Sequence, residues 1–273
     1  MPTPITLSGL YCYPVKSLRG LELEHSRLDR FGLVHDRRWM VVDREGKFLS
    51  QRQLPRMALI QVELVSYGLR LSGPDMPILQ VGTPTRAAPT IEVEVWQDRL
   101  QGAVVGQQAD LWLSRSLGVE CRLVYMLDDE KRQVDPRYAE AHHLTAFSDG
   151  FPLLLASEAS LEALNSRLDT PFLTMARFRP NLVVSGSEAY AEDRWARIRV
   201  GSMALQLVKP CSRCSITTVD PETAVRGSEP LATLATYRRR GKQVYFGQNV
   251  IYDHPGELRL GSAVEILEYH DEQ

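Results

Sequence analysis

The chain has 273 residues, of which 44% are hydrophobic and 24% are charged, and its formal net charge is -2 at pH 7. This is the composition of an ordinary globular protein, and so small a net charge gives no reason to expect binding to nucleic acid or to an acidic membrane surface. No apolar stretch approaches the ~20 residues that a membrane-spanning helix needs. Four cysteines do not make a disulfide framework in a chain of this length, so we expect a protein of the reducing cytoplasm.

Short strands dominate the first half of the sequence. Residues 5–13 and residues 90–96 alternate between two faces, which is the pattern of half-buried strands. The strands that we expect in this half cover residues 5–13, 21–24, 36–43, 47–49, 57–65, 69–71, 90–96, 100–105 and 121–127. A helix is expected over residues 108–117, with Gly118 as its end. Short strands with a turn every ~8–12 residues predict an all-β barrel or sandwich.

A long polar segment separates the two halves. Residues 128–146 hold the charged run 128–132, Pro136 and two adjacent histidines. A connection of this length inside a compact fold is usually functional or a linker. We therefore place the domain boundary at its start, which gives an N-terminal domain over residues 1–127 and a C-terminal domain over residues 128–273.

The second half combines strands with two helices. We expect strands over residues 153–156, 182–184 and 215–219, a helix capped by Ser157 that reaches about Leu168, and a helix from Pro230 to about Arg240. Residues 198–207 echo residues 258–267, each as a strand, a Gly-Ser turn and a strand, and residues 246–249 interrupt the strand that follows the second helix. Two such hairpins fit a small barrel better than a layered α/β sheet.

The segment 209–220 concentrates chemically active side chains. It holds Cys211 and Cys214, with Lys209 and Arg213 beside them. Nearby cations favour the charged form of a thiol, and thiolate sulfur is the ligand that soft metals prefer. We interpret the rest of the chain as a scaffold that presents one of these thiolates to a soft metal.

Three other interpretations of the Cys-x-x-Cys pair compete with this one. A structural zinc site needs four ligands, but there is no second pair, and His142 and His143 are adjacent, which is not a usual metal spacing. A redox pair would sit at the start of a helix, whereas residues 215–219 favour a strand. A small buried hydrophobic residue is the simplest role for a cysteine, and we expect it for one of the two.

No familiar nucleotide, protease or hydrolase motif is present, because the sequence has no Gly-x-Gly-x-x-Gly, P-loop, His-Glu-x-x-His or Gly-x-Ser-x-Gly. Cations beside hydroxyl or amide groups stand instead at the ends of predicted strands, in the clusters Lys16-Ser17, Arg37-Arg38, Arg177 with Arg179 and Asn181, and Ser212-Arg213. Arginine matches phosphate in a bidentate fashion. Converging loops would make a pocket for a phosphorylated cofactor beside a cysteine, although each cluster by itself is more often solvated surface.

Five ordered motifs carry a resemblance to a known family. They cover residues 13–17, 178–186, 190–195, 211–221 and 246–248. With them the sequence resembles the MOSC family, and within it the amidoxime-reducing components and their bacterial relatives, over nearly the whole chain. The resemblance implies a mainly β (α+β) protein, with an N-terminal MOSC β-barrel domain, a MOSC β-barrel domain and a few peripheral helices.

The resemblance also implies a molybdenum cofactor (Mo-molybdopterin) held between the two domains. Cys214 matches the family's metal ligand, and Ser148 and Asp149 match a loop near the metal, where Asp149 is a candidate proton donor or a group that supports the metal's ligands, and equally fits a turn. The positions that match the family's pterin-binding and phosphate-binding residues are Lys16, Ser17, Arg37, Ser148, Arg179, Asn181, Ser212, Arg213 and Asn249. Animal members have tyrosine at the position of Asn249. Binding of pyridoxal phosphate is not expected.

The activity that the resemblance implies is reduction of N-hydroxylated compounds, among them amidoximes, hydroxylamines and N-hydroxylated purines. A ferredoxin-like cysteine cluster is missing, so electrons are expected from a separate ferredoxin-type or cytochrome-type protein with its reductase. The targeting and membrane-anchoring segment of mitochondrial members is also missing, so we expect a cytoplasmic protein without a membrane partner. Two alternatives stay open: a sulfur carrier with a persulfide on Cys211 or Cys214, and a non-catalytic pterin-binding scaffold.

Overall fold

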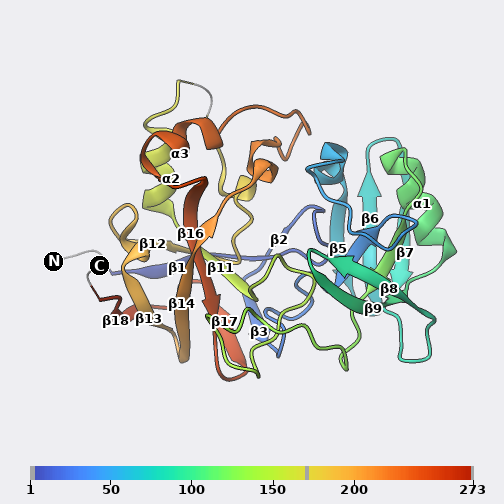
Figure 1. Ribbon diagram of the computed structural model, residues 1–273, viewed down its shortest axis with the longest axis horizontal. Coiled ribbons are helices and arrows are strands. Elements are labelled where there is room, and N and C mark those ends of the chain that lie inside the picture. Colours follow the sequence, from blue (N-terminus) through green and yellow to red (C-terminus); the bar gives the residue numbers. More distant parts are fainter. Residues whose placement is uncertain (1–3, 170–171, 272–273) are drawn as a thin grey trace.

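Two β-rich bodies lie side by side in the computed structural model, which describes residues 4–169 and 172–271 (Figure 1). The first, which we term the nine-stranded body, carries helices α2 (Glu158–Asn165) and α3 (Leu231–Tyr237). The second, the two-sheet body, contains sheets of four and three strands together with helix α1 (Gln107–Leu117). The predicted mainly β fold with a few peripheral helices is therefore confirmed.

The nine-stranded body is a curled sheet whose ends meet. Its strands in spatial order are β18 (Val264–Tyr269), β13 (Trp195–Val200), β14 (Met203–Ser212), β16 (Gln243–Ile251), β11 (Leu153–Ser157), β12 (Leu182–Ser185), β1 (Thr6–Cys12) and β2 (Leu21–Glu22), with β15 (Arg239–Arg240) paired to β16. Leu7 N–H donates to Ser262 at 2.9 Å, and Val264 N–H donates to Ile5 at 2.9 Å. These bonds bring β1 beside the start of β18 and enclose an apolar core that includes Trp195.

Strand β1 places the N-terminal residues in the sheet of the C-terminal half. It pairs with β12 and β2, and β3 (His25–Leu28) pairs with β17 (Gly256–Arg259). The segment after β1, residues 13–17, consequently runs along the junction between the two bodies. The division at residues 127 and 128 stays a prediction, and the sheets pair across it.

The two-sheet body packs its sheets and one helix around a second core. Its elements are β4 (Trp39–Val42), β10 (Arg122–Tyr125), β9 (Asp98–Val104) and β8 (Thr90–Val95) in one sheet, β5 (Gln61–Val65), β6 (Gly68–Gly73) and β7 (Met76–Gly82) in the other, and α1. Trp39, Leu69, Trp112 and Leu123 pack in this core. Helix α1 ends at Gly118, whose φ of 72° is the left-handed conformation that glycine adopts without strain.

Several predicted boundaries need correction. The strand predicted over residues 57–65 begins only at Gln61, because residues 55–59 form a 3-10 helix, η1 (Pro55–Leu59), that begins with a proline. Strand β7 was not predicted, since its exposed face carries Ile78 and hides the alternation. Helix α2 is capped by Ser157 as predicted but ends at Asn165, and helix α3 begins after Pro230 and ends at Tyr237.

The strand predicted over residues 215–219 is wrong. Residues Ser215–Thr218 form a 3-10 helix, η4. The Thr217 hydroxyl donates to the Cys214 carbonyl at 3.1 Å, and the Thr218 hydroxyl donates to the Ser215 carbonyl at 2.8 Å. Such bonds from side chain to backbone stabilise a tight turn and outweigh the β propensity of threonine. The other 3-10 helices are η2 (Met175–Arg177) and η3 (Ala191–Asp193).

The second predicted hairpin and the predicted strand interruption also differ from the structure. Residues 198–207 do form a hairpin, but in the echoing segment β17 pairs with β3 and β18 pairs with β13, so the Gly-Ser turn there connects two different sheets. Residues 246–249 bend β16 without breaking it. Pro210 pairs with Gln248 and Ser212 pairs with Tyr245, which leaves one extra residue in β16, a bulge at Gly247.

Helices in the described part of the chain are all too short or too polar to cross a membrane.

The bulge at Gly247 predicts a local intolerance of side chains. Gly247 has a φ of 78°, and a Cβ there would lie 2.7 Å from the Leu155 carbonyl oxygen. Gly241 has a φ of 60° but open space around it, so Gly241→Ala measures the left-handed strain alone, about 1 kcal/mol. We expect Gly247→Ala to lower the free energy of unfolding in urea by a further ~1–3 kcal/mol through the clash. Equal losses in the two variants would contradict the bulge.

Candidate functional site

A cavity of about 230 Å³ lies where the two bodies meet. Its lining comes from the loop after β1, the loops on both sides of β4, β11 and the segment before it, the segment before β12, β14 with the residues that follow it, and β16. The eleven residues predicted for the site all line it: Lys16, Ser17, Arg37, Ser148, Asp149, Arg179, Asn181, Ser212, Arg213, Cys214 and Asn249. The structure thus brings the predicted set together, and the role of each residue stays a prediction.

Positive charge in the cavity exceeds negative charge. The cationic lining residues are Lys16, Arg37, Arg52, Arg179, Lys209 and Arg213, and Asp149 is the carboxylate among the described lining residues. Two guanidinium nitrogens, Arg179 Nη2 and Arg213 Nε, are buried and have no hydrogen-bond partner within the described residues. Buried donors normally find acceptors. The cavity is therefore suited to an anionic ligand with several acceptor oxygens.

Backbone strain is concentrated at the same residues. Ser17, Arg37 and Arg179 have φ values of 68°, 49° and 54°, in the left-handed region that costs a residue with a Cβ roughly 1–2 kcal/mol. Strained residues of this kind cluster where a ligand is held. Three of the predicted site residues thus adopt a left-handed backbone conformation that residues with a Cβ disfavour.

Arg37 and Arg179 lie against one tyrosine. Each guanidinium carbon lies 4.2 Å from the centre of the Tyr13 ring. Arg37 donates to the buried Asp36 carboxylate at 2.5 Å and to the Arg179 carbonyl at 3.1 Å. Burial, together with the charge of Arg37, lowers the pKa of Arg179 to about 10. Asp36 thus neutralises the charge of Arg37, whereas the charge of Arg179 is available to a bound anion.

The Cys-x-x-Cys pair opens into the cavity. Cys214 Sγ accepts a long hydrogen bond from Arg52 Nη1 at 3.7 Å, and Cys211 Sγ accepts one from Arg213 Nη1 at 2.9 Å. Both cysteines are half-buried, free and in the lining. The expectation that one of them is a buried core residue is wrong. That description fits Cys12 and Cys121 instead, because the turn of η4 keeps the 211–214 segment at the surface of the cavity.

Lys16 and Asp149 form an ion pair across the cavity wall. Lys16 Nζ lies 2.5 Å from Asp149 Oδ1, which also accepts from Trp96 Nε1 at 3.2 Å. Burial lowers the pKa of Lys16 to about 8, against the opposing effect of Asp149. Burial acts to raise the pKa of Asp149, but the charges of Lys16 and Arg52 and the Trp96 N–H outweigh it, so this pKa lies well below its usual range. At neutral pH the lysine carries the proton.

Arg132 holds the loop that presents Asp149. Its Nη1 donates to the carbonyls of Ala146 and Ser148, at 2.9 and 2.5 Å, and its Nε donates to Asp98 Oδ2 at 2.7 Å. The long connection predicted before β11 is confirmed as a segment without strands or helices, and this buried arginine fixes its last turn. The sequence showed Arg132 only as part of a charged run.

Three predicted cofactor-binding side chains form hydrogen bonds within the protein. Asn181 accepts from Leu154 N at 3.2 Å and donates to the Tyr11 carbonyl at 3.0 Å, which joins β1 to β11. The Ser148 hydroxyl donates to the Phe151 carbonyl at 2.8 Å, and Asn249 donates to the Lys209 carbonyl at 3.2 Å. In the described part of the chain, the hydroxyls of Ser17 and Ser212 have no such partner and face the cavity free.

Three residues near the thiol were missed by the sequence analysis. Phe48 and Arg52 line the cavity, and Trp96 stacks over Arg52 with the guanidinium carbon 4.5 Å from the ring centre. Trp96 occupies the first position of the two-residue turn between β8 and β9 with a φ of 59°. Glycine, asparagine or aspartate is usual at such a turn position, and the predicted strand over residues 90–96 included Trp96, so nothing in the sequence marked this tryptophan as a turn residue.

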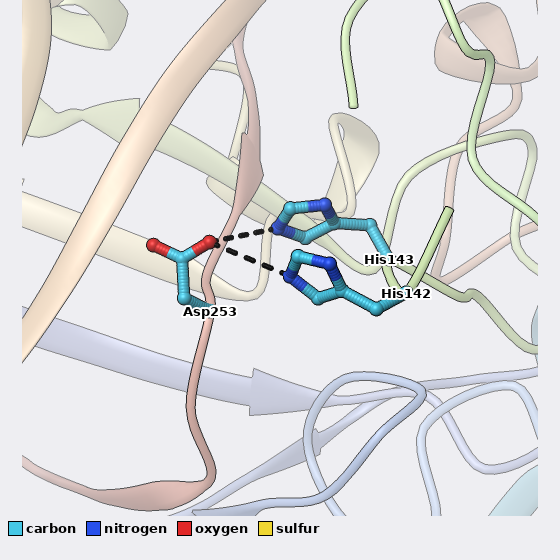
Figure 2. Close-up of side chains that lie close together, drawn as sticks. All are labelled: His142, His143 and Asp253. Atoms are coloured by element: carbon cyan, nitrogen blue, oxygen red, sulfur yellow. Dashed lines mark hydrogen bonds and ion pairs between the residues drawn. The ribbon is translucent and has the colours of Figure 1, made fainter. Parts of the chain in front are cut away.

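A separate cluster of two histidines and an aspartate has the residue types of a metal site, but its hydrogen bonds oppose metal binding by His143. His142, His143 and Asp253 lie together, with one carboxylate oxygen of Asp253 facing both imidazole rings (Figure 2). Glu140 N–H donates to His143 Nδ1 at 3.1 Å, so neutral His143 carries its proton on Nε2, which lies 3.1 Å from Asp253 Oδ1. A metal at Nε2 would move that proton to Nδ1, against the Glu140 N–H. The cluster ties the connection to the turn after β16.

Comparison with known proteins agrees with this geometry. Residues 5–120 match the family model of the MOSC N-terminal beta barrel domain, and residues 142–265 match that of the MOSC domain. Mitochondrial amidoxime-reducing component 1 from Mus musculus is 37% identical, across 96% of this chain and 82% of its own length. The chain belongs to the MOSC family. The proteins of the same name from Xenopus laevis and Homo sapiens are 37% and 35% identical, over 81% and 83% of their lengths.

The pKa of Lys16 predicts how anion binding in this MOSC protein depends on pH. Below about pH 8 the lysine is charged and affinity is constant; as the pH rises above 8 the free protein loses this proton, so an anion binds more weakly. Calorimetric titration with sulfate, whose charge is constant in this range, measures the decline from pH 6.5 to pH 9. Lys16→Arg keeps its charge across this range and is expected to give a flat profile. Parallel profiles for wild type and Lys16→Arg would contradict the assignment.

Proposed function

We propose that this protein is a molybdenum cofactor-dependent reductase of N-hydroxylated compounds, such as amidoximes, hydroxylamines and N-hydroxylated purines, which receives electrons from a separate donor protein. The observation that carries the proposal is a cysteine thiol in the same cavity as an excess of buried positive charge. Thiolates bind soft metals, and arginines bind phosphate. The relatives, which are named amidoxime-reducing components, supply the class of reaction.

The cavity fits the cofactor in its donor set. Cys214 would hold the metal, because its sulfur is in the lining and lies beside Arg52. The unpartnered nitrogens of Arg179 and Arg213 and the free hydroxyls of Ser17 and Ser212 would hold the phosphate and the pterin, with Arg37 and Lys16 adding charge. When bound, the cofactor supplies two-electron redox chemistry.

The reaction needs two protons as well as two electrons. An amidoxime loses its N–O bond, gains an N–H bond and becomes an amidine, and the oxygen leaves as water, while the donor protein is oxidised by two electrons. Lys16 is the acid that the cavity offers, since a pKa of about 8 keeps it protonated at neutral pH and still able to release the proton. Asp149 stays ionised and has no proton to give at neutral pH, so we propose that it supports the reaction by holding the Lys16 ammonium in place.

Replacing each cysteine in turn tests the metal assignment. In protein produced by a cofactor-competent host, Cys214→Ser is expected to lose reduction of benzamidoxime under a chemical reductant, because the thiolate ligand is gone. Cys211→Ser is the matched control and is expected to retain both molybdenum and turnover, since a hydroxyl still accepts the bond from Arg213. Metal analysis accompanies each assay. Wild-type protein that holds cyanide-releasable sulfur and no molybdenum would contradict the proposal and favour a sulfur carrier.

Asp149→Asn separates the two roles of the carboxylate. Asp149 opposes the lowering of the Lys16 pKa by burial, so its removal lowers that pKa below 8. We expect the alkaline decline of kcat/KM for benzamidoxime to move to lower pH, with activity retained on the acid side. A uniform loss at every pH, in protein with its full molybdenum content, would contradict this and make Asp149 itself the proton donor.

A further inference from the structure

An aromatic wall lies at the mouth of the cavity near the thiol, made by Phe48, which is in the cavity lining, and by Trp96, which packs against Phe48 just outside that lining. Trp96 and Phe48 meet edge to face, with ring centres 5.1 Å apart. Arg52 lies against both, with its guanidinium carbon 4.5 Å from the Trp96 ring centre and 5.4 Å from that of Phe48. The same guanidinium group reaches Cys214 Sγ at 3.7 Å. One cation therefore connects the aromatic wall to the predicted metal ligand.

Trp96 is held in place at a conformational cost. Its backbone is in the left-handed region, which for a bulky residue marks strain. Its indole N–H donates to Asp149 Oδ1 at 3.2 Å, across the junction between the two bodies. Even with these contacts its relative exposure is 46%. A strained, oriented and exposed tryptophan leaves part of its ring surface available to a ligand in the mouth.

Other walls of the cavity combine charged groups with apolar side chains, among them Phe151 and Phe178. Lys16 lies over the ring of Phe48, with its Nζ 5.1 Å from the ring centre. A substrate beside the Cys214 thiol would meet cations, a carboxylate and the aromatic surface of Trp96 and Phe48, which Arg52 connects to the sulfur. The N-hydroxylated group is polar and fits the first two, and a planar aromatic substituent fits the third.

We propose that Trp96, supported by Phe48 and Arg52, is a specificity-determining residue that selects N-hydroxylated substrates with a planar aromatic substituent by stacking against it. This inference rests on the proposed function. Aromatic pairs contribute ~0.5–1.5 kcal/mol beyond the burial of their area. That range corresponds to discrimination of about twofold to twelvefold between aromatic and aliphatic substrates of the same reaction.

A binding experiment tests the wall without turnover. Of the four tryptophans, Trp39, Trp112 and Trp195 are at most 6% exposed, so Trp96 is the one that a ligand in the mouth can reach. Benzamidoxime, added without reductant, is expected to quench the fluorescence of wild-type protein, and acetamidoxime is expected to quench it far less. Trp96→Phe should lose the quenching. Equal quenching in wild type and Trp96→Phe would overturn the proposal.

A kinetic experiment tests selection. In loaded protein, Trp96→Ala is expected to lower the ratio of kcat/KM for benzamidoxime to that for acetamidoxime by about twofold to twelvefold, mainly through KM. Trp96→Phe keeps a ring but lacks the N–H, so it should restore most of the ratio. Tyr67→Ala, another exposed aromatic residue at a hairpin turn of the same body, is the matched control and should leave the ratio unchanged.

The outcomes separate the two proposals. An unchanged ratio in Trp96→Ala, in a protein that turns over both amidoximes, would overturn selection by Trp96 and leave the proposed function standing. Wild-type protein that holds molybdenum and reduces neither amidoxime would overturn the proposed function, and the quenching experiment would then still decide whether Trp96 faces an aromatic ligand.

Discussion

Lys16 and Asp149 meet at 2.5 Å between a loop that follows the first strand and a loop that precedes β11. This ion pair neutralises one positive charge in a cavity that holds several more. Burying a cation without a partner is costly, and Arg179 and Arg213 keep donor nitrogens that no described residue satisfies. The protein tolerates this arrangement because two bodies, each with its own core, hold the cations in position. Such a cavity is ready for an anion.

The path of the first strand explains how one cavity draws on both bodies. β1 pairs within the nine-stranded sheet, and the chain then turns along the junction before it enters the two-sheet body. Residues close in sequence thus face residues far away, as Lys16 faces Asp149. The turn between β8 and β9, in the two-sheet body, contacts the same carboxylate, because Trp96 donates to Asp149. The carboxylate is where three segments of the chain meet.

Local patterns in the sequence were sufficient for most strands and for α1, where alternation or helical spacing coincides with a turn residue such as Gly118. They failed where the tertiary structure decides. Threonine hydroxyls bond back to the chain and turn residues 215–218 into a 3-10 helix, and β17 leaves its expected partner for β3. The five motifs contain seven of the eleven predicted residues around the cavity, and the resemblance over nearly the whole chain supplied Arg37, Ser148, Asp149 and Asn249. Arg52 and Trp96 belong to none of those motifs, and their importance follows only from their distances to Cys214 and Asp149.

The account depends on the sulfur of Cys214 as a ligand of the metal. X-ray absorption at the molybdenum edge measures this directly in loaded wild-type, Cys214→Ser and Cys211→Ser proteins. We predict that the metal in Cys214→Ser has lost a sulfur neighbour and gained an oxygen or nitrogen neighbour, while the spectrum of Cys211→Ser matches that of the wild type. A sulfur shell that is the same in all three proteins would contradict the assignment.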